Sequence, residues 1–250
     1  MAERITSPQN PYLQHVKKLR AVRKYRYANR AFLADGSKLV EEAIRWGLTP
    51  EAILTREGVP FSVPEGVRHI IISDRLMKDV SRMDTPQGVM AVCPMPEQRA
   101  PELVPGCLIL DGIQDPGNLG TILRTADAFD LPVVLSEGCA DPYGEKTVRA
   151  TMGAVFRTQP CQADRRTILD SLRAKQIPLC VTALSPRAQD IRALDLKRFA
   201  VVIGSEGQGV CADFLQAADQ EAIIPMSPRC ESLNAAAAAM IVLWQLFAKG

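Results

Sequence analysis

The chain has 250 residues, a net charge of +2, 47% hydrophobic residues and 23% charged residues. These values are ordinary for a globular protein, so they exclude a disordered chain and favour one large or two modest domains. The longest apolar run, residues 235–247, is too short to span a bilayer and predicts a buried helix. We therefore expect no membrane as a partner.

The seven cysteines are scattered, without a Cys-x-x-Cys pair, and only His15 and His69 could join them as soft metal ligands. This is a poor set of residues for a zinc site or a disulfide framework. We expect reduced, mostly buried cysteines, no bound metal and a cytoplasmic protein.

Positive charge is concentrated at the start of the chain. Residues 1–34 carry eight Lys or Arg and one acid, which leaves a net charge of −5 on the remainder. Such a segment suits phosphate backbones, and Tyr25 and Tyr27 among the cations could stack on bases. A solvated helix face is the alternative. The candidate RNA-binding residues are Lys17, Lys18, Arg20, Arg23, Lys24 and Arg26.

The chain up to residue 94 alternates between helical and strand patterns. The predicted elements are a helix that Ser37 caps and Gly47 closes, strands at 52–55 and 69–72, a short helix near 74–82 and a strand at 88–93. This order predicts a small α/β domain over residues 1–94. Residues 95–105 are rich in proline and poor in apolar residues, so we expect them to form an interdomain linker.

After this linker the alternation becomes clearer. Apolar runs bounded by turn residues predict strands at 107–110, 133–136, 179–183, 200–204 and 222–225, with helical stretches between most of them. Near-continuous apolar strands separated by helices imply a parallel sheet covered on both faces. The second domain, residues 106–250, is therefore predicted to bind ligands beyond the carboxyl ends of its strands.

Three segments follow such strand ends, and the first is residues 111–129. Asn118 is expected to cap the helix that follows a Pro-Gly turn. At 100° per residue, Arg124 lies about 200° from Ile122 on the apolar face. Arg124 should therefore point toward solvent, a partner subunit or a substrate. The alternative is a surface arginine paired with Asp127.

The second segment, residues 204–209, has three glycines in six residues, which permits a close approach of the backbone to a ligand. It lacks both the P-loop ending and the dinucleotide fingerprint. Glu206 at its centre is unsuited to binding a phosphate, because a carboxylate repels an anion. We expect Glu206 to accept a hydroxyl, an amide or a cation.

The third segment, residues 224–240, again has the order strand, loop, helix. Ser232 is the candidate N-cap of that helix. Asn234 lies in the first turn, near the ligand end, and a second capping residue is the alternative for it. The alanines at 235–239 let another helix come close.

Taken together, these segments resemble the SpoU/TrmH family of RNA ribose 2′-O-methyltransferases. The matching residues are Asn118, Gly120, Arg124, Thr125 and Ala126, then Gly204, Glu206 and Gly209, then Ile224, Pro225, Met226, Ser232, Leu233 and Asn234, together with residues 148–157. This resemblance covers residues 107–247. Residues 5–93 also resemble the substrate-binding domain of the ribosomal-RNA branch, with Asp35 where many relatives have glutamate. Because that domain begins by Ile5, we expect no transit peptide.

The resemblance implies an α/β fold with a deep C-terminal trefoil knot, a homodimer formed through the C-terminal domain, and S-adenosylmethionine as the cofactor. Carried over by position, the cofactor-binding residues are Thr182, Ala183, Gly204, Ile224, Met226, Ser232 and Leu233. The catalytic group is Asn118, Arg124, Glu206 and Asn234. The small N-terminal α/β domain would bind RNA.

The reaction implied is methyl transfer to a ribose 2′-hydroxyl of RNA, with 23S-type ribosomal RNA as the leading substrate and transfer RNA as the alternative. Arg124 is the favoured activating residue of the family. A guanidinium stays charged in proteins, so we interpret Arg124 as holding a phosphate or the hydroxyl rather than removing a proton. A non-catalytic RNA-binding or ribosome-assembly factor is a second reading. A nucleotide-binding oxidoreductase is disfavoured because the glycine fingerprint is missing.

Overall fold

The computed structural model describes residues 2–81, 83–97, 100–101 and 103–248. The chain forms two compact units. The first comprises residues 1–97 and 143–157, and the second comprises residues 98–142 and 158–250. Part of the predicted linker, residues 98, 99 and 102, lies outside the described residues. No described helix is long and apolar enough to cross a membrane.

The first unit is built on a mixed five-stranded sheet. Its strands are β1 (Glu3–Ile5), β2 (Ala31–Asp35), β3 (Ala52–Arg56), β4 (Arg68–Ile72) and β5 (Val89–Pro94), in the order β1-β4-β3-β5-β2. Its helices are α1 (Pro11–Ala21), α2 (Arg23–Asn29), α3 (Ser37–Arg45), α4 (Asp74–Val80), α6 (Glu145–Ala150) and α7 (Val155–Thr158). β1, β4 and β3 run parallel, whereas β5 is antiparallel to β3 and β2.

Helices cover both faces of this sheet. Apolar side chains of α1 and α4, among them Leu13 and Met77, pack on one face. Val40 of α3 packs on the other, and the segment 143–157 joins it there through buried residues such as Phe156. A stretch that lies between two strands of the second unit in sequence thus belongs to the core of the first.

The second unit contains a seven-stranded sheet in which every pair runs parallel. Its strands are β6 (Leu108–Asp111), β7 (Val133–Leu135), β8 (Cys161–Gln162), β9 (Leu179–Thr182), β10 (Gln189–Asp190), β11 (Ala200–Gly204) and β12 (Gln220–Ile223), in the order β10-β12-β9-β11-β6-β7-β8. The helices are α5 (Pro116–Ala128), α8 (Arg165–Ala174), α9 (Ala212–Ala217) and α10 (Ala235–Ala248), with short 3-10 turns at Ile191–Ala193 and Leu196–Arg198.

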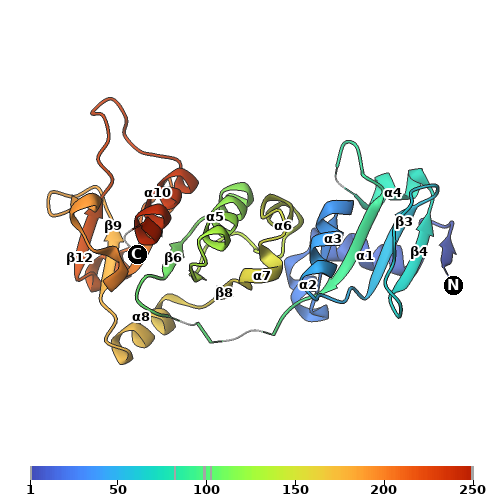
Figure 1. The fold of residues 1–250 in the computed structure, drawn as a ribbon, viewed down its shortest axis with the longest axis horizontal. Helices are drawn as coiled ribbons and strands as arrows, with labels where there is room; N and C mark the ends of the chain where they lie inside the picture. The colour runs from blue at the N-terminus through green and yellow to red at the C-terminus, as the bar shows by residue number, and fades with distance from the viewer. Residues whose placement is uncertain (1, 82, 98–99, 102, 249–250) are drawn as a thin grey trace. The chain divides into compact units, whose positions relative to one another are not determined.

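Side chains that alternate along the parallel strands pack into two separate hydrophobic cores, one on each face of the sheet. On β6, Leu108 and Leu110 face the side covered by α5 and α10, which lie next to each other (Figure 1). Cys107 and Ile109 face the side covered by α8 and α9. The prediction of a parallel sheet covered on both faces is therefore confirmed.

Three predicted helix caps are wrong, each by a few residues. α3 begins at Ser37, and its N-cap position is Gly36 without a side-chain cap. The cap of α5 is Asp115, whose side chain accepts a hydrogen bond from the backbone N–H of Asn118. α10 is capped by Asn234 rather than Ser232, because the Asn234 Oδ1 accepts from the N–H groups of Ala236 and Ala237, so the capping alternative for Asn234 is confirmed. In each case a neighbouring residue with the right chemistry or backbone takes the position.

A pair of buried carboxyl groups lies between β2 and α6 in the first unit. Asp35 is 4% exposed and accepts a hydrogen bond of 2.6 Å from the Ser81 hydroxyl. Glu145 is also buried, and one oxygen of each carboxyl group lacks a hydrogen-bond partner among the described residues. Burial and the nearby Glu145 raise the pKa of Asp35 to about 6, although Ser81, Arg149 and Arg20 act in the opposite direction.

This raised pKa predicts a pH-dependent stability. As pH rises from about 4 past 6, the unfolded chain loses the Asp35 proton that the folded chain retains, so this group lowers stability across that window. Asp35→Asn cannot ionise. We expect it to stabilise the protein by about 1–3 kcal/mol more at pH 8 than at pH 4 in urea unfolding. Asp84→Asn, at an exposed site, is the matched control, and an equal effect of Asp35→Asn at both pH values would contradict this assignment.

Candidate active site

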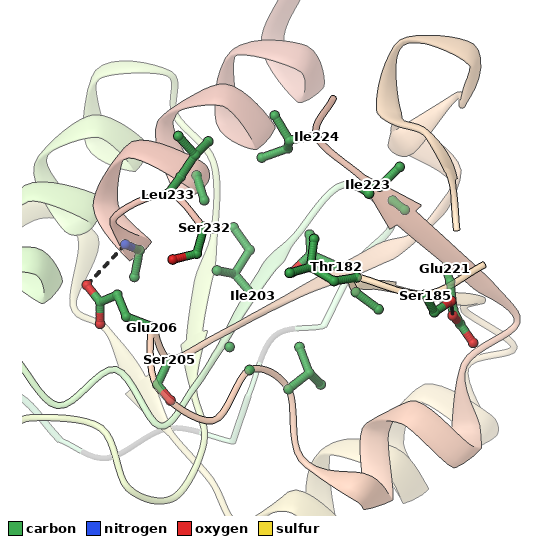
Figure 2. Close-up of a pocket in the computed structure, with 18 of the residues that line it drawn as sticks. Thr182, Ser185, Ile203, Ser205, Glu206, Glu221, Ile223, Ile224, Ser232 and Leu233 are labelled. Carbon is green, nitrogen blue, oxygen red and sulfur yellow. Dashed lines mark hydrogen bonds between the residues drawn. The ribbon is translucent and has the colours of Figure 1, made fainter. Parts of the chain in front are cut away.

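A pocket of about 580 Å³ opens at the carboxyl ends of β9, β11 and β12 in the second unit. Figure 2 shows its apolar middle, with Ile203, Ile224 and Leu233, between the polar ends marked by Glu206 and Glu221. All seven predicted cofactor residues line this pocket: Thr182, Ala183, Gly204, Ile224, Met226, Ser232 and Leu233. The pocket lies where open parallel sheets bind their ligands.

The glycine-rich loop folds back on itself at the mouth of this pocket. Ser205 and Gly209 form an isolated bridge. A Cβ on Gly204 would lie 2.0 Å from the Gly209 carbonyl carbon, so only glycine fits there. Gly209 has a φ of +68°, a conformation that favours glycine as well. By contrast, a Cβ on Gly207 would meet nothing within 4 Å.

Three of the four predicted catalytic residues meet around one oxygen atom. The Glu206 Oε1 accepts hydrogen bonds from the Asn118 Nδ2 at 2.5 Å, the Asn234 Nδ2 at 3.2 Å and the backbone N–H of Ala235 at 3.1 Å. The Asn234 Nδ2 also donates to the Asn118 Oδ1 at 3.1 Å. The segments that follow β6, β11 and β12, including the first turns of α5 and α10, are thereby joined.

The fourth residue, Arg124, takes no part in the hydrogen bonds of this cluster. It is exposed on α5, as its helical phase predicted, while Ile122 is buried. Within the described part of the chain, its guanidinium forms no hydrogen bond or ion pair, including with Asp127. Arg124 is thus available to a group that comes from outside the chain.

A buried carboxylate that the sequence analysis did not select holds the end of the glycine-rich loop through hydrogen bonds. Asp111, 2% exposed at the end of β6, accepts hydrogen bonds from the Ser136 hydroxyl at 2.6 Å, the Arg165 Nε at 3.0 Å and the backbone N–H of Cys211 at 2.8 Å. Burial alone raises its pKa, but these hydrogen bonds outweigh burial and hold the pKa below its usual value. Asp111 therefore fixes the far end of the glycine-rich loop as an ionised group.

The sequence analysis also did not select Glu221, which marks one of the two polar ends of the pocket. The buried Glu221 accepts hydrogen bonds from the Ser185 hydroxyl and from the Arg187 guanidinium. Glu221 precedes the predicted strand at 222–225 among polar residues, so the apolar pattern gave no signal for it. Among the described residues, no group of three or more His, Cys, Asp or Glu side chains could hold a metal ion.

The six predicted RNA-binding residues fall into two groups. Arg26 is 5% exposed and donates to the carbonyl oxygen of Leu19, while Arg20 donates to carbonyl oxygens at the end of α4, so both support the fold. Lys17 is partly buried and forms an ion pair with Asp79. The exposed members are Lys18, Arg23 and Lys24.

This arrangement defines an α/β enzyme with a cofactor pocket and a polar cluster at the carboxyl ends of a parallel sheet. The family model of the SpoU rRNA methylase family matches residues 105–244, and that of the MRM3-like substrate binding domain matches residues 10–91. The chain belongs to the SpoU rRNA methylase family. It is an RNA methyltransferase that uses S-adenosylmethionine, as the resemblance predicted.

Individual relatives match almost the whole chain. The 23S rRNA guanosine 2′-O-methyltransferase RlmP of Bacillus subtilis is 35% identical over 98% of this chain and 99% of its own length. The human mitochondrial rRNA methyltransferase 3 is 27% identical over 89% of this chain and 69% of its own. The crystal structure of an AdoMet-bound rRNA methyltransferase from Sinorhizobium meliloti superimposes with a TM-score of 0.87, 29% identity, and coverage of 99% and 98%.

The closed glycine-rich loop gives a direct test of the pocket. Gly204→Ala should displace the loop and weaken S-adenosylmethionine binding about tenfold or more, because the added methyl group overlaps the Gly209 backbone. Gly207→Ala, where space is open, should change the Kd by less than about threefold, under 0.7 kcal/mol. Isothermal titration calorimetry measures both. Equal affinities of the two variants would show that this loop does not shape the cofactor pocket.

Proposed function

We propose that this protein transfers a methyl group from S-adenosylmethionine to a ribose 2′-hydroxyl of 23S-type ribosomal RNA. The full-length similarity to RlmP, whose name states that reaction, carries the proposal. Two further observations support it: the chain has a match to a substrate-binding domain, and three proposed catalytic side chains share one hydrogen-bonded cluster. Transfer RNA remains the alternative substrate.

The pocket fits the proposed cofactor in shape and polarity. Its apolar walls at Ile203, Ile224 and Leu233 suit the flat face of an adenine ring. At one end of the pocket, Glu221 is paired with Arg187, and both side chains line the pocket, so this end offers polar groups to the polar parts of the cofactor. Bound S-adenosylmethionine supplies a methyl group already activated on a sulfonium.

The chain's own residues then have to orient the ribose and stabilise charge. In the proposed mechanism, Asn118 and Asn234 position the ribose, and Glu206 braces both amides through Oε1. Arg124 holds an RNA phosphate or the reacting hydroxyl, and its permanent positive charge stabilises the developing oxyanion. Its exposed position without an internal partner supports this role.

The exposed Lys18, Arg23 and Lys24 of the first unit form the proposed contact with the RNA backbone.

The proposal also includes a deep trefoil knot in the C-terminal segment and a cytoplasmic location. Sheet order supports the knot, since β12 returns to the far side of β9 after β11 has been placed.

A homodimer through the C-terminal domain completes the proposal. α10 leaves Met240, Ile241, Trp244 and Phe247 exposed, and the last two form an aromatic cluster with Phe129. An exposed apolar stripe of this kind is typical of an interface between subunits.

The reaction and the role of Arg124 are tested together. We expect the wild-type protein to transfer labelled methyl from S-adenosylmethionine to unmodified 23S rRNA, and nuclease digestion to release the label as a 2′-O-methylated nucleoside. Arg124→Ala should lower the single-turnover rate about 100-fold or more, with an unchanged Kd for the cofactor. Arg124→Lys should recover part of the rate.

Two results would contradict this proposal. A near-normal rate for Arg124→Ala would remove the residue from the mechanism. Label that enters transfer RNA, and not ribosomal RNA, would select the alternative substrate.

The proposed dimer predicts a change in mass. Sedimentation velocity should give twice the 27.4 kDa of the chain for the wild type. Trp244→Glu places a charge in the centre of the apolar stripe and should yield a monomer, because burying an unpaired carboxylate is costly. Gln216→Glu, at an exposed position on α9, adds the same charge outside the stripe and serves as the control. A wild type that sediments as a monomer would contradict the dimer.

A further inference from the structure

Trp46 is an exposed aromatic side chain on the first unit. It follows the last turn of α3 and is 53% exposed, whereas the apolar side of that helix, including Val40 and Ala43, is buried. Single exposed apolar side chains are common on protein surfaces, so exposure alone indicates no function. The contacts that fix the ring are what distinguish Trp46.

Polar groups, rather than core packing, hold the indole in place. Its Nε1 donates to the Glu42 Oε2 at 3.3 Å. The guanidinium carbon of Arg157 lies 5.0 Å from the ring centroid, in the range of a cation–π contact. The Arg157 Nη1 donates to the same Glu42 oxygen at 3.1 Å. These three side chains form a closed set of contacts that orients the ring.

Glu42 itself is fixed from two sides. A Cβ on Gly153, which has a φ of +97°, would lie 3.1 Å from the Glu42 Cβ, so the turn before α7 packs tightly against this side chain. Arg45 forms a second ion pair with Glu42 at 3.5 Å. Two guanidinium groups, of Arg45 and Arg157, therefore contact one carboxylate beside the exposed ring.

We propose that Trp46 is a stacking platform for an unpaired base of the substrate RNA. The proposal rests on the proposed function in that it takes RNA as the substrate. An oriented aromatic face with guanidinium groups next to it suits a nucleobase attached to a phosphate backbone. Bases within an A-form duplex are already stacked, so only an unpaired base can use the platform.

The surroundings of Trp46 favour a nucleobase over a protein partner. Among the described residues of the first unit, the other large exposed apolar side chains are Val22 and Met152. Protein interfaces have an apolar core of several neighbouring residues, which so small a set does not provide. A single stacked base needs only one ring.

Binding measurements test the platform with three proteins and two RNA probes. The proteins are the wild type, Trp46→Ala and Trp46→Phe, and the probes are single-stranded oligoadenylate and an RNA duplex of the same length. Trp46→Ala should weaken binding of the single strand about 5- to 150-fold, since stacking contributes about 1–3 kcal/mol per base. Trp46→Phe keeps a ring and should stay close to the wild type. Duplex binding should be equal for all three.

Salt dependence separates stacking from a loss of positive charge. Stacking releases no counterions, so the slope of log K against log salt should be the same for the wild type and Trp46→Ala. A flatter slope for Trp46→Ala would mean that the variant has disturbed Arg157 or Arg45, and would overturn the stacking assignment.

Fluorescence gives a second readout that does not depend on affinity. The chain has two tryptophans, Trp46 and Trp244, so Trp46→Phe removes one signal and retains the other. Oligoadenylate should quench the wild type, and the quenching should be absent in Trp46→Phe even though that variant still binds. Quenching that persists in Trp46→Phe, or that follows protein concentration without RNA, would overturn the proposal.

The outcomes for this platform and for the proposed function are distinct. If the wild type methylates ribosomal RNA while Trp46→Ala binds oligoadenylate as tightly as the wild type, the platform is wrong and the proposed function stands. If the wild type transfers no methyl group to any RNA, the proposed function fails first. Circular dichroism melting of Trp46→Ala establishes that the variant is folded before its affinity is interpreted.

Discussion

The candidate active site depends on one carboxylate oxygen. The Glu206 Oε1 accepts hydrogen bonds from Asn118, Asn234 and the backbone of Ala235, which belong to segments separated by up to 116 residues in the chain. Without this acceptor, the two amides would have to find other partners, and three loops would lose their common anchor. Asp111 has the corresponding role for the glycine-rich loop, where its hydrogen bonds join three segments, at Ser136, Arg165 and Cys211, to the end of β6.

The sequence predicted best those elements whose structure is determined by a single physical cause. Four apolar runs in the second unit became strands over most of their length, because a strand buried on both faces requires apolar residues. Of the fifth run, 222–225, only Ala222 and Ile223 lie in β12, which begins at Gln220. Arg124 was placed correctly from helical phase alone, since the period of 3.6 residues leaves it opposite the buried Ile122. The position of the pocket at the strand ends was predictable because parallel strands align their carboxyl ends, whereas the individual lining residues were given by the family resemblance.

Other features depend on competition between neighbouring residues or on distant contacts. Asp115 and Asn234 are the N-caps, although neighbouring residues have similar capping chemistry. A single sequence does not show which of several such neighbours takes the N-cap position. The segment 143–157 packs on the sheet of the first unit, although it lies between strands of the second. The contacts of Trp46 combine α3 with α7, which are more than 100 residues apart. Local periodicity carries no information about such pairings.

The central claim is that Glu206 acts by holding Asn118 and Asn234 in position, and not through its charge. Single-turnover methyl transfer at saturating S-adenosylmethionine tests it with two variants. Glu206→Ala removes the acceptor and should lower the rate about 100-fold or more, whereas the amide oxygen of Glu206→Gln can replace Oε1 and should retain most of the rate. A wild-type rate for Glu206→Ala, or an equal loss in both variants, would contradict the claim.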